Sequence, residues 1–222
     1  MTTTTKESDA PRLSERMVYF FGKGQTSDGR GLRDLLGGKG AGLAEMSSLG
    51  IPVPPGFTIT TEVCNAFYGL GRTYPDGLEP QVLEGLRKIE EQVGAKFGDA
   101  DNPLLVSVRS GARVSMPGMM DTILNLGLND VTAAGLAKRS GNERFVFDSY
   151  RRFVQMYGDV VLGVGKATDT DHDPFEVLLT AKKKSRGVAV DTDLDAGALK
   201  ELVAEFKALA LERAGSPFPE DP

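Results

Sequence analysis

The pattern of apolar residues changes near residue 129, and this change limits the fold more than any other feature of the chain. Before it, short apolar runs at residues 17–21 and 104–108 predict strands, separated by glycine-rich turns and helices. After it, the spacing predicts helices near residues 130–139, 142–161, 174–186 and 195–213. Strands early in the chain and helices late in it indicate an α+β fold.

A run of glycines precedes the first expected helix. Residues 37–42 have the sequence GGKGAG, and glycine N–H groups at a helix start can approach an anion closely, with Lys39 as a movable charge. The run is not a Walker A motif, because Gly40 follows the lysine, nor a dinucleotide fingerprint, because Leu43 replaces the required Gly or Ala. A tight turn that lets a helix pack near a strand explains the glycines equally well, so the residues alone leave both interpretations open.

Two more helices are expected before the strand at residues 104–108. The first carries Cys64 on an apolar face with no basic residue nearby in sequence, which predicts a buried thiol without chemistry. The second has one apolar stripe, formed by Val82, Leu86, Ile89, Val93 and Phe97.

The segment after the strand at residues 104–108 is the most unusual in the chain. Residues 109–122 have the sequence RSGARVSMPGMMDT, in which Arg109 and Arg113 flank Gly111. A guanidinium binds phosphate through two hydrogen bonds, each worth about 1.5–3 kcal/mol when partly desolvated. The methionines and glycine that follow suit a flexible cover over a ligand. In the alternative interpretation, Arg109 pairs with a structural carboxylate and the methionines fill a gap in the core.

Composition excludes several classes of function. The chain has 26 basic and 31 acidic residues, and its longest basic block is residues 182–184, so we expect no nucleic-acid binding. A single cysteine and a single histidine, His172, exclude an internal disulfide and an ordinary Cys/His zinc site. The polar start of the chain and the absence of eighteen consecutive apolar residues predict no membrane span and a cytoplasmic location.

An acidic run before the third late helix imitates the start of a calcium loop. Asp169, Asp171 and Asp173 have the right spacing, but Pro174 and Thr180 replace the glycine and glutamate of such a loop. We therefore expect a cap ahead of a helix that begins at Pro174.

Four segments of the chain closely resemble the amino-terminal region of the pyruvate, phosphate dikinase family, namely LLGGKGAGLAEM, LGIPVPPGFTIT, SVRSGARVSMPGMMDTILNLGLN and ERFVFDSYRRFVQMYGDVVLGV. The resemblance extends from about Met17 to the end of the chain. The more distant phosphoenolpyruvate synthases share the pattern around the lysine and the arginine but not SMPGMMDT, so the dikinase is the better match.

The resemblance implies an ATP-grasp domain, in which two lobes enclose ATP and Mg²⁺. The implied reaction converts ATP, pyruvate and orthophosphate to AMP, phosphoenolpyruvate and diphosphate through a phosphohistidine. Lys39 and Arg109 match the family's catalytic phosphate contacts. The resemblance also implies a wider nucleotide-binding set, which comprises Gly38, Lys39, Arg109, Ser115, Gly118, Met119, Met120, Asp121 and Thr122.

The expected organisation is a disordered tail at residues 1–16, the first ATP-grasp lobe at 17–128, a helical subdomain at 129–215 and a linker at 216–222. The family continues into a second lobe with the metal ligands, a histidine domain and a pyruvate-binding barrel, so we expect this chain alone to be inactive in the full reaction. An uncovered inner face would favour a homodimer. The alternatives are a lobe of the phosphoenolpyruvate synthase type and a catalytically inactive nucleotide-binding module.

Overall fold

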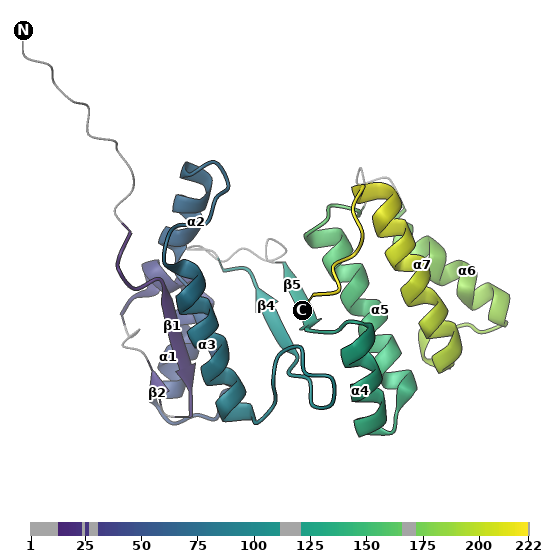
Figure 1. Ribbon diagram of the computed structural model, residues 1–222, viewed down its shortest axis with the longest axis horizontal. Coiled ribbons are helices and arrows are strands. Elements are labelled where there is room, and N and C mark those ends of the chain that lie inside the picture. Colours follow the sequence, from purple (N-terminus) through teal and green to yellow (C-terminus); the bar gives the residue numbers. More distant parts are fainter. Residues whose placement is uncertain (1–12, 24, 27–30, 112–120, 166–171, 222) are drawn as a thin grey trace, which may run out of the picture. The chain divides into compact units, whose positions relative to one another are not determined.

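The computed structural model describes residues 13–23, 25–26, 31–111, 121–165 and 172–221 (Figure 1). The chain forms two compact units. The first lies within Met1–Gly94, and the second combines Ala95–Ser110 with Asp121–Pro222. Both contain helices and an antiparallel sheet, so the predicted α+β class is confirmed. No helix among the described residues has the length and apolar character needed to cross a membrane.

The first unit is built on a small antiparallel sheet of strand order β2-β1-β3. Its strands are β1 (Val18–Gly22), β2 (Gln25–Thr26) and β3 (Gly56–Ile59), and its helices are α1 (Arg33–Ser48), α2 (Thr61–Gly69) and α3 (Leu78–Val93). Helices α1 and α3 pack on β1 and β3. A buried cluster joins the start of the sheet to α2 and α3, and its members are Met17, Val18, Val63 and Leu78.

Residues 13–16 belong to the first unit, although the sequence placed them in a disordered tail. Leu13 packs against the buried cluster, and the Ser14 N–H donates to Glu62 Oε2 over 3.1 Å. The Gln81 side chain donates to the carbonyl of Glu15 over 3.0 Å. Residues 1–12, the rest of the expected tail, lie outside the described part of the chain.

Two expectations about helices in the first unit were wrong. Helix α3 ends at Val93 because Gly94 adopts a left-handed conformation with φ of 72°, so Phe97 is not part of the apolar stripe. Cys64 is exposed rather than buried, because α2 turns Val63 and Ala66 toward the core and Cys64 away from it.

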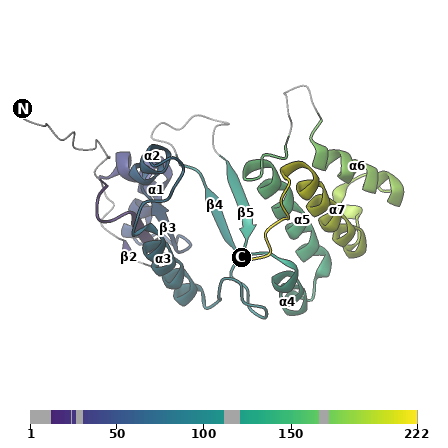
Figure 2. The ribbon, with the colours of Figure 1, turned by 45° about the horizontal axis from the view of Figure 1, so that its top comes forward.

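The second unit combines a two-stranded ribbon with four long helices. Strands β4 (Val106–Arg109) and β5 (Thr122–Leu126) are antiparallel, and the helices are α4 (Asp130–Ser140), α5 (Glu143–Val160), α6 (Pro174–Arg186) and α7 (Ala196–Ala214). Helix α5 contacts β5, α4 and α7, and α7 lies alongside it in both ribbon views (Figures 1 and 2). Helix α5 is therefore the centre of this unit.

The boundaries of these four helices follow from local signals, and all four predicted helices are confirmed to within one residue at each end. Each begins after an Asn or Asp whose side chain accepts a backbone N–H of the first turn; these residues are Asn129, Asn142, Asp173 and Asp195. Three of the helices end at a glycine with positive φ, namely Gly141, Gly187 and Gly215.

The ribbon belongs with the helices rather than with the first sheet. Ile123 and Leu128 are buried in the core formed by α4 to α7, and Leu105 and Leu126 pack against it. The two compact units therefore divide after Gly94, whereas the sequence placed the lobe boundary at residues 128/129. The assignment of residues 17–128 to one ATP-grasp lobe stays a prediction.

The segment after α7 packs on the second unit, although residues 216–222 were expected to form a linker. Phe218 is only 5% exposed and meets Phe153 and Tyr157 edge to face, with ring centroids 5.7 and 5.2 Å apart. The carbonyl of Glu220 accepts from Asn129 Nδ2 over 2.8 Å. Residues 216–221 thus cover one end of the helical core.

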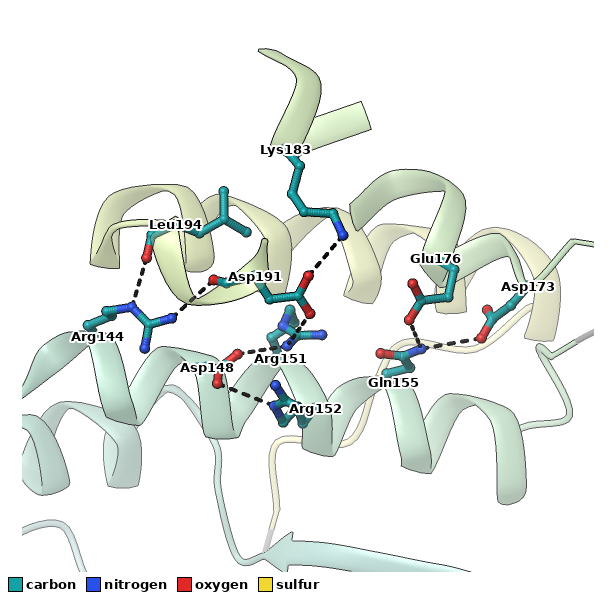
Figure 3. A network of polar contacts seen from close by, with 10 residues as sticks. All are labelled: Arg144, Asp148, Arg151, Arg152, Gln155, Asp173, Glu176, Lys183, Asp191 and Leu194. Atoms are coloured by element: carbon teal, nitrogen blue, oxygen red, sulfur yellow. Dashed lines mark hydrogen bonds and ion pairs between the residues drawn. The ribbon is translucent and has the colours of Figure 1, made fainter. Parts of the chain in front are cut away.

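A buried arginine ties the connection between α6 and α7 to α5 (Figure 3). Arg151 is 2% exposed, donates to Asp148 Oδ1 over 2.7 Å and lies 3.6 Å from Asp191 Oδ2. Lys183 contacts the other Asp191 oxygen at 2.9 Å. Burial raises the pKa of the Asp191 carboxyl, but the hydrogen bond and charge of Lys183 and the charge of Arg151 outweigh it and hold the pKa below its ordinary value.

This network predicts a loss of stability in acid. Because the pKa of Asp191 is lower in the folded chain, the unfolded chain takes up the proton first, and the free energy of unfolding falls as the pH drops below about 4. We expect Asp191→Asn to lower the free energy of unfolding at pH 7 by about 1–3 kcal/mol and to flatten its dependence on pH between about 5 and 3. Urea unfolding followed by circular dichroism over this pH range measures both effects.

Asp193 provides the control, because it lies on the same short 3-10 helix, Asp191–Asp193, but is exposed and takes no part in the network of Figure 3. Asp193→Asn should keep the wild-type slope. Equal slopes for the two variants would contradict the role assigned to Asp191.

Candidate functional site

Helix α1 is interrupted inside the glycine run. Gly37 has φ of 68° and ψ of 169°, which is not helical, so a second helical segment begins at Gly38. Only glycine adopts this conformation without strain. The interruption places the exposed Lys39 in the first turn of the second segment, where the positive end of the helix dipole lies.

Packing explains some of the glycines but not all. A Cβ on Gly40 would lie 2.7 and 2.8 Å from the Cγ2 and Oγ1 atoms of Thr58, so this glycine lets α1 approach β3. A Cβ on Gly38 would meet only the end of the Arg33 side chain at 3.7 Å, an ordinary contact, and one on Gly42 would meet nothing within 4 Å. The packing interpretation therefore accounts for Gly40, whereas Gly38 has no steric reason to be glycine.

The second group of candidates gathers at one end of the β4–β5 ribbon. Arg109, the last residue of β4, is paired with Thr122, the first residue of β5. Residues paired in this way carry their side chains on the same face, with Cβ atoms about 4.5–5.5 Å apart. Arg109 and Asp121 are exposed and Thr122 is half-buried. The fold thus brings three predicted residues together.

Ser110 closes this end of the ribbon, a role that sequence reasoning missed. Its N–H donates to the carbonyl of Asp121 over 3.0 Å, and its Oγ donates to the same oxygen over 3.2 Å. The pairing of the two strands therefore continues one residue beyond Arg109. The only signal in the sequence is a small hydroxyl residue directly after the strand.

The remaining predicted residues are placed as follows. Lys39 and Gly38 are in the first unit, and Arg109, Asp121 and Thr122 are in the second. Ser115, Gly118, Met119 and Met120 lie outside the described residues, as does Arg113. The roles of all these residues as phosphate contacts stay predictions.

Arg87 is an arginine whose side chain is already paired with carboxylates of its own helix. It lies half-exposed on α3, 2.8 Å from Glu84 and in an ion pair with Glu91. The Arg87 hydrogen bond lowers the pKa of the Glu84 carboxyl to about 2. Arg87 is therefore a useful comparison for Arg109.

Asp173, the last aspartate of the acidic run, caps α6. Asp173 Oδ1 accepts the N–H of Phe175 over 2.8 Å, and Pro174 occupies the first helical position, so the predicted cap is confirmed. Asp169 and Asp171 lie outside the described residues. Within the described ranges, no three His, Cys, Asp or Glu side chains gather in a way that could hold a metal ion.

Comparison with known proteins gives one family model and several similar relatives. Residues 33–76, which span α1, β3 and α2, match the model described as "Pyruvate phosphate dikinase, AMP/ATP-binding domain". Pyruvate, phosphate dikinase 2 of Zea mays is 54% identical over 209 residues, which are 94% of this chain and 23% of the relative. The Clostridium symbiosum dikinase is 53% identical over 208 residues, 93% of this chain and 23% of the relative. The Rhizobium meliloti (strain 1021) dikinase is 52% identical over 207 residues, with 93% and 22% covered.

These comparisons confirm the resemblance that the four motifs indicated. The similarity covers nearly the whole chain, and the chain spans about a fifth of the length of the curated relatives it matches. The family model includes Gly38 and Lys39 within its matched residues.

The steric difference between two glycines of α1 gives a test of the local structure. Gly40→Ala should lower the free energy of unfolding by about 1–3 kcal/mol, because Thr58 and β3 must move away from the new methyl group. Gly42→Ala should raise it by about 0.5–1 kcal/mol, because alanine reduces the freedom of the unfolded chain and meets no neighbour. Urea unfolding of both variants measures the difference. A Gly40→Ala variant as stable as the wild type would show that α1 does not approach β3 through this residue.

Proposed function

We propose that this chain, which is similar to pyruvate, phosphate dikinases over more than nine-tenths of its length, forms the ATP-binding portion of such an enzyme. The observation that carries the proposal is this extended similarity, together with the match of residues 33–76 to an AMP/ATP-binding domain. In the proposed reaction ATP, pyruvate and orthophosphate give AMP, phosphoenolpyruvate and diphosphate. Residues 17–128, which include the β4–β5 ribbon, would form the first lobe of an ATP-grasp domain. Helices α4 to α7 would form its helical subdomain.

Lys39 and Arg109 are the proposed phosphate contacts. Transfer of a phosphoryl group requires little covalent chemistry from the protein, so catalysis consists of positioning and of stabilising charge on the phosphate oxygens. Arg109 is suited to two parallel hydrogen bonds from a fixed strand end, and Lys39 to a point charge at a helix start. The exposure of both side chains supports such contacts with a ligand.

The other proposed nucleotide-binding residues support these two cations. Gly38 permits close approach of the backbone next to Lys39. Thr122 places a hydroxyl beside Arg109, and the carbonyl of Asp121 closes the ribbon end. The sequence also assigns Ser115, Gly118, Met119 and Met120 to this set.

Mg²⁺, which neutralises phosphate charge in this class of reaction when it is bound, finds no matching group of ligands among the described residues. The proposal assigns Mg²⁺ no ligand among these residues and no step. Among the alternatives, the names of the relatives favour a dikinase over an enzyme of the phosphoenolpyruvate synthase type. A cytoplasmic location is also proposed, supported by the single, unpaired Cys64.

The proposal predicts that ATP affinity depends on Arg109. We expect Arg109→Ala to raise the dissociation constant for ATP by at least about tenfold, because one or two charge-assisted hydrogen bonds of about 1.5–3 kcal/mol each are lost. Isothermal titration calorimetry of the whole chain with Mg-ATP measures this constant. Lys39→Ala tests the second cation in the same assay.

Arg87→Ala is the matched control, because it removes the same side chain from a solvent-exposed position that is already paired with carboxylates. It should leave the dissociation constant unchanged. Equal affinities of the Arg109 and Arg87 variants would contradict the assigned contact. A wild-type chain without affinity for ATP would contradict the proposed function and the nucleotide-binding module alternative alike.

A further inference from the structure

The β4–β5 ribbon contains a register shift close to Arg109. Val106 is paired with Leu126, but Val108 is paired with Ile123 and Arg109 with Thr122. Two steps along β4 therefore correspond to three steps along β5, and Leu124 and Asn125 together lie opposite Ser107. Such a β-bulge inserts one extra residue into one strand and redirects the residues on either side of it.

The bulge allows two residues of β5 to face the same core. Ile123 is buried among the helices of the second unit, and Leu126 packs against the same core. In a regular strand, residues three apart point to opposite faces. The extra residue reverses the alternation, so that both side chains reach the helices, while Leu124 between them is 41% exposed.

The same shift decides which residue stands beside Arg109. If the pairing continued from Val106 and Leu126 without a bulge, Arg109 would lie opposite Ile123. Leu124 would then face the core in place of Ile123. With the bulge, Thr122 lies opposite Arg109, and the neighbour of the guanidinium carries a hydroxyl group instead of an apolar chain.

The backbone of Asn125 makes the shift possible. Its φ is 61°, in the left-handed region that few residues other than glycine occupy, and asparagine is among those that tolerate it best. Its carbonyl accepts the N–H of Leu128 over 3.2 Å. Gly127 then passes so close to the segment before β4 that a Cβ would lie 2.8 Å from the carbonyl oxygen of Leu104. The turn after the bulge thus lies directly against the residues that lead into β4.

We propose that Asn125 is a positioning residue for the phosphate contact, because its left-handed backbone sets the register that pairs Arg109 with Thr122. Asn125 itself does not touch the ligand. The inference rests on the proposed role of Arg109 in binding ATP, and it adds the reason why the strand end presents an arginine and a threonine on one face.

Three variants at this position give different predictions. Asn125→Val disfavours positive φ and should drive the ribbon toward the regular register, with a rise of about tenfold or more in the dissociation constant for ATP. Asn125→Gly keeps the left-handed conformation and should bind ATP within about twofold of the wild type. Removal of Asn125 takes away the extra residue, so Leu124 alone would face Ser107 and Thr122 would stay opposite Arg109. This shortened chain should bind within about threefold of the wild type.

The experiment measures register and affinity separately in the whole chain. Nuclear Overhauser contacts between the backbones of Val108 and Ile123 report the register without any ligand, and isothermal titration with Mg-ATP reports the affinity. The wild type, the glycine variant and the shortened chain should show the Val108–Ile123 contact. The valine variant should replace it with a contact between Val108 and Leu124.

Each outcome decides between the proposals. A valine variant that loses the contact but binds ATP as tightly as the wild type would overturn the positioning role and leave the proposed function intact. If the valine variant fails to fold, the glycine variant decides, because loss of the Val108–Ile123 contact or of ATP affinity in a variant that keeps the left-handed conformation would equally overturn the inference. A wild-type chain that shows the contact but does not bind ATP would overturn the proposed function and the inference with it.

Discussion

The packing of Ile123 against the helical core is the interaction on which the proposed site depends most. It joins the β4–β5 ribbon to α5, which is itself held by α4 and α7. A two-stranded ribbon alone is marginally stable in water, so its fixed geometry must come from these helices. Arg109, at the end of the ribbon, is exposed, although Ile123 of the same ribbon is buried in the helical core. This combination suits a residue that must meet a charged ligand in a constant position.

The glycine run of α1 meets two structural requirements. Gly37 is needed for a backbone conformation, and Gly40 for the approach of α1 to β3. Neither requirement applies to Gly38, which precedes Lys39 at the start of the second helical segment. The packing interpretation is therefore supported for Gly40, and the anion-binding interpretation of Gly38 stays a proposal.

Features set by neighbouring residues could be predicted from the sequence, and features set by distant contacts could not. The helices of the second unit were predicted almost to the residue, because their caps lie within one turn of their ends. The burial of Phe218 depends on aromatic rings more than sixty residues away, so a proline-rich segment was mistaken for a linker. In our proposal the pairing of Arg109 with Thr122 depends on the positive φ of Asn125. The alternation of apolar residues does not predict this backbone conformation.

The central proposal is that Lys39 in the glycine run and Arg109 at the ribbon end both contact the phosphates of ATP. The most direct measurement is a titration of the labelled whole chain with Mg-ATP, followed by amide chemical shifts in NMR. The account predicts that the amides of Lys39 and Thr122 shift together and give the same dissociation constant. Shifts confined to one of the two segments, or two different constants, would contradict it.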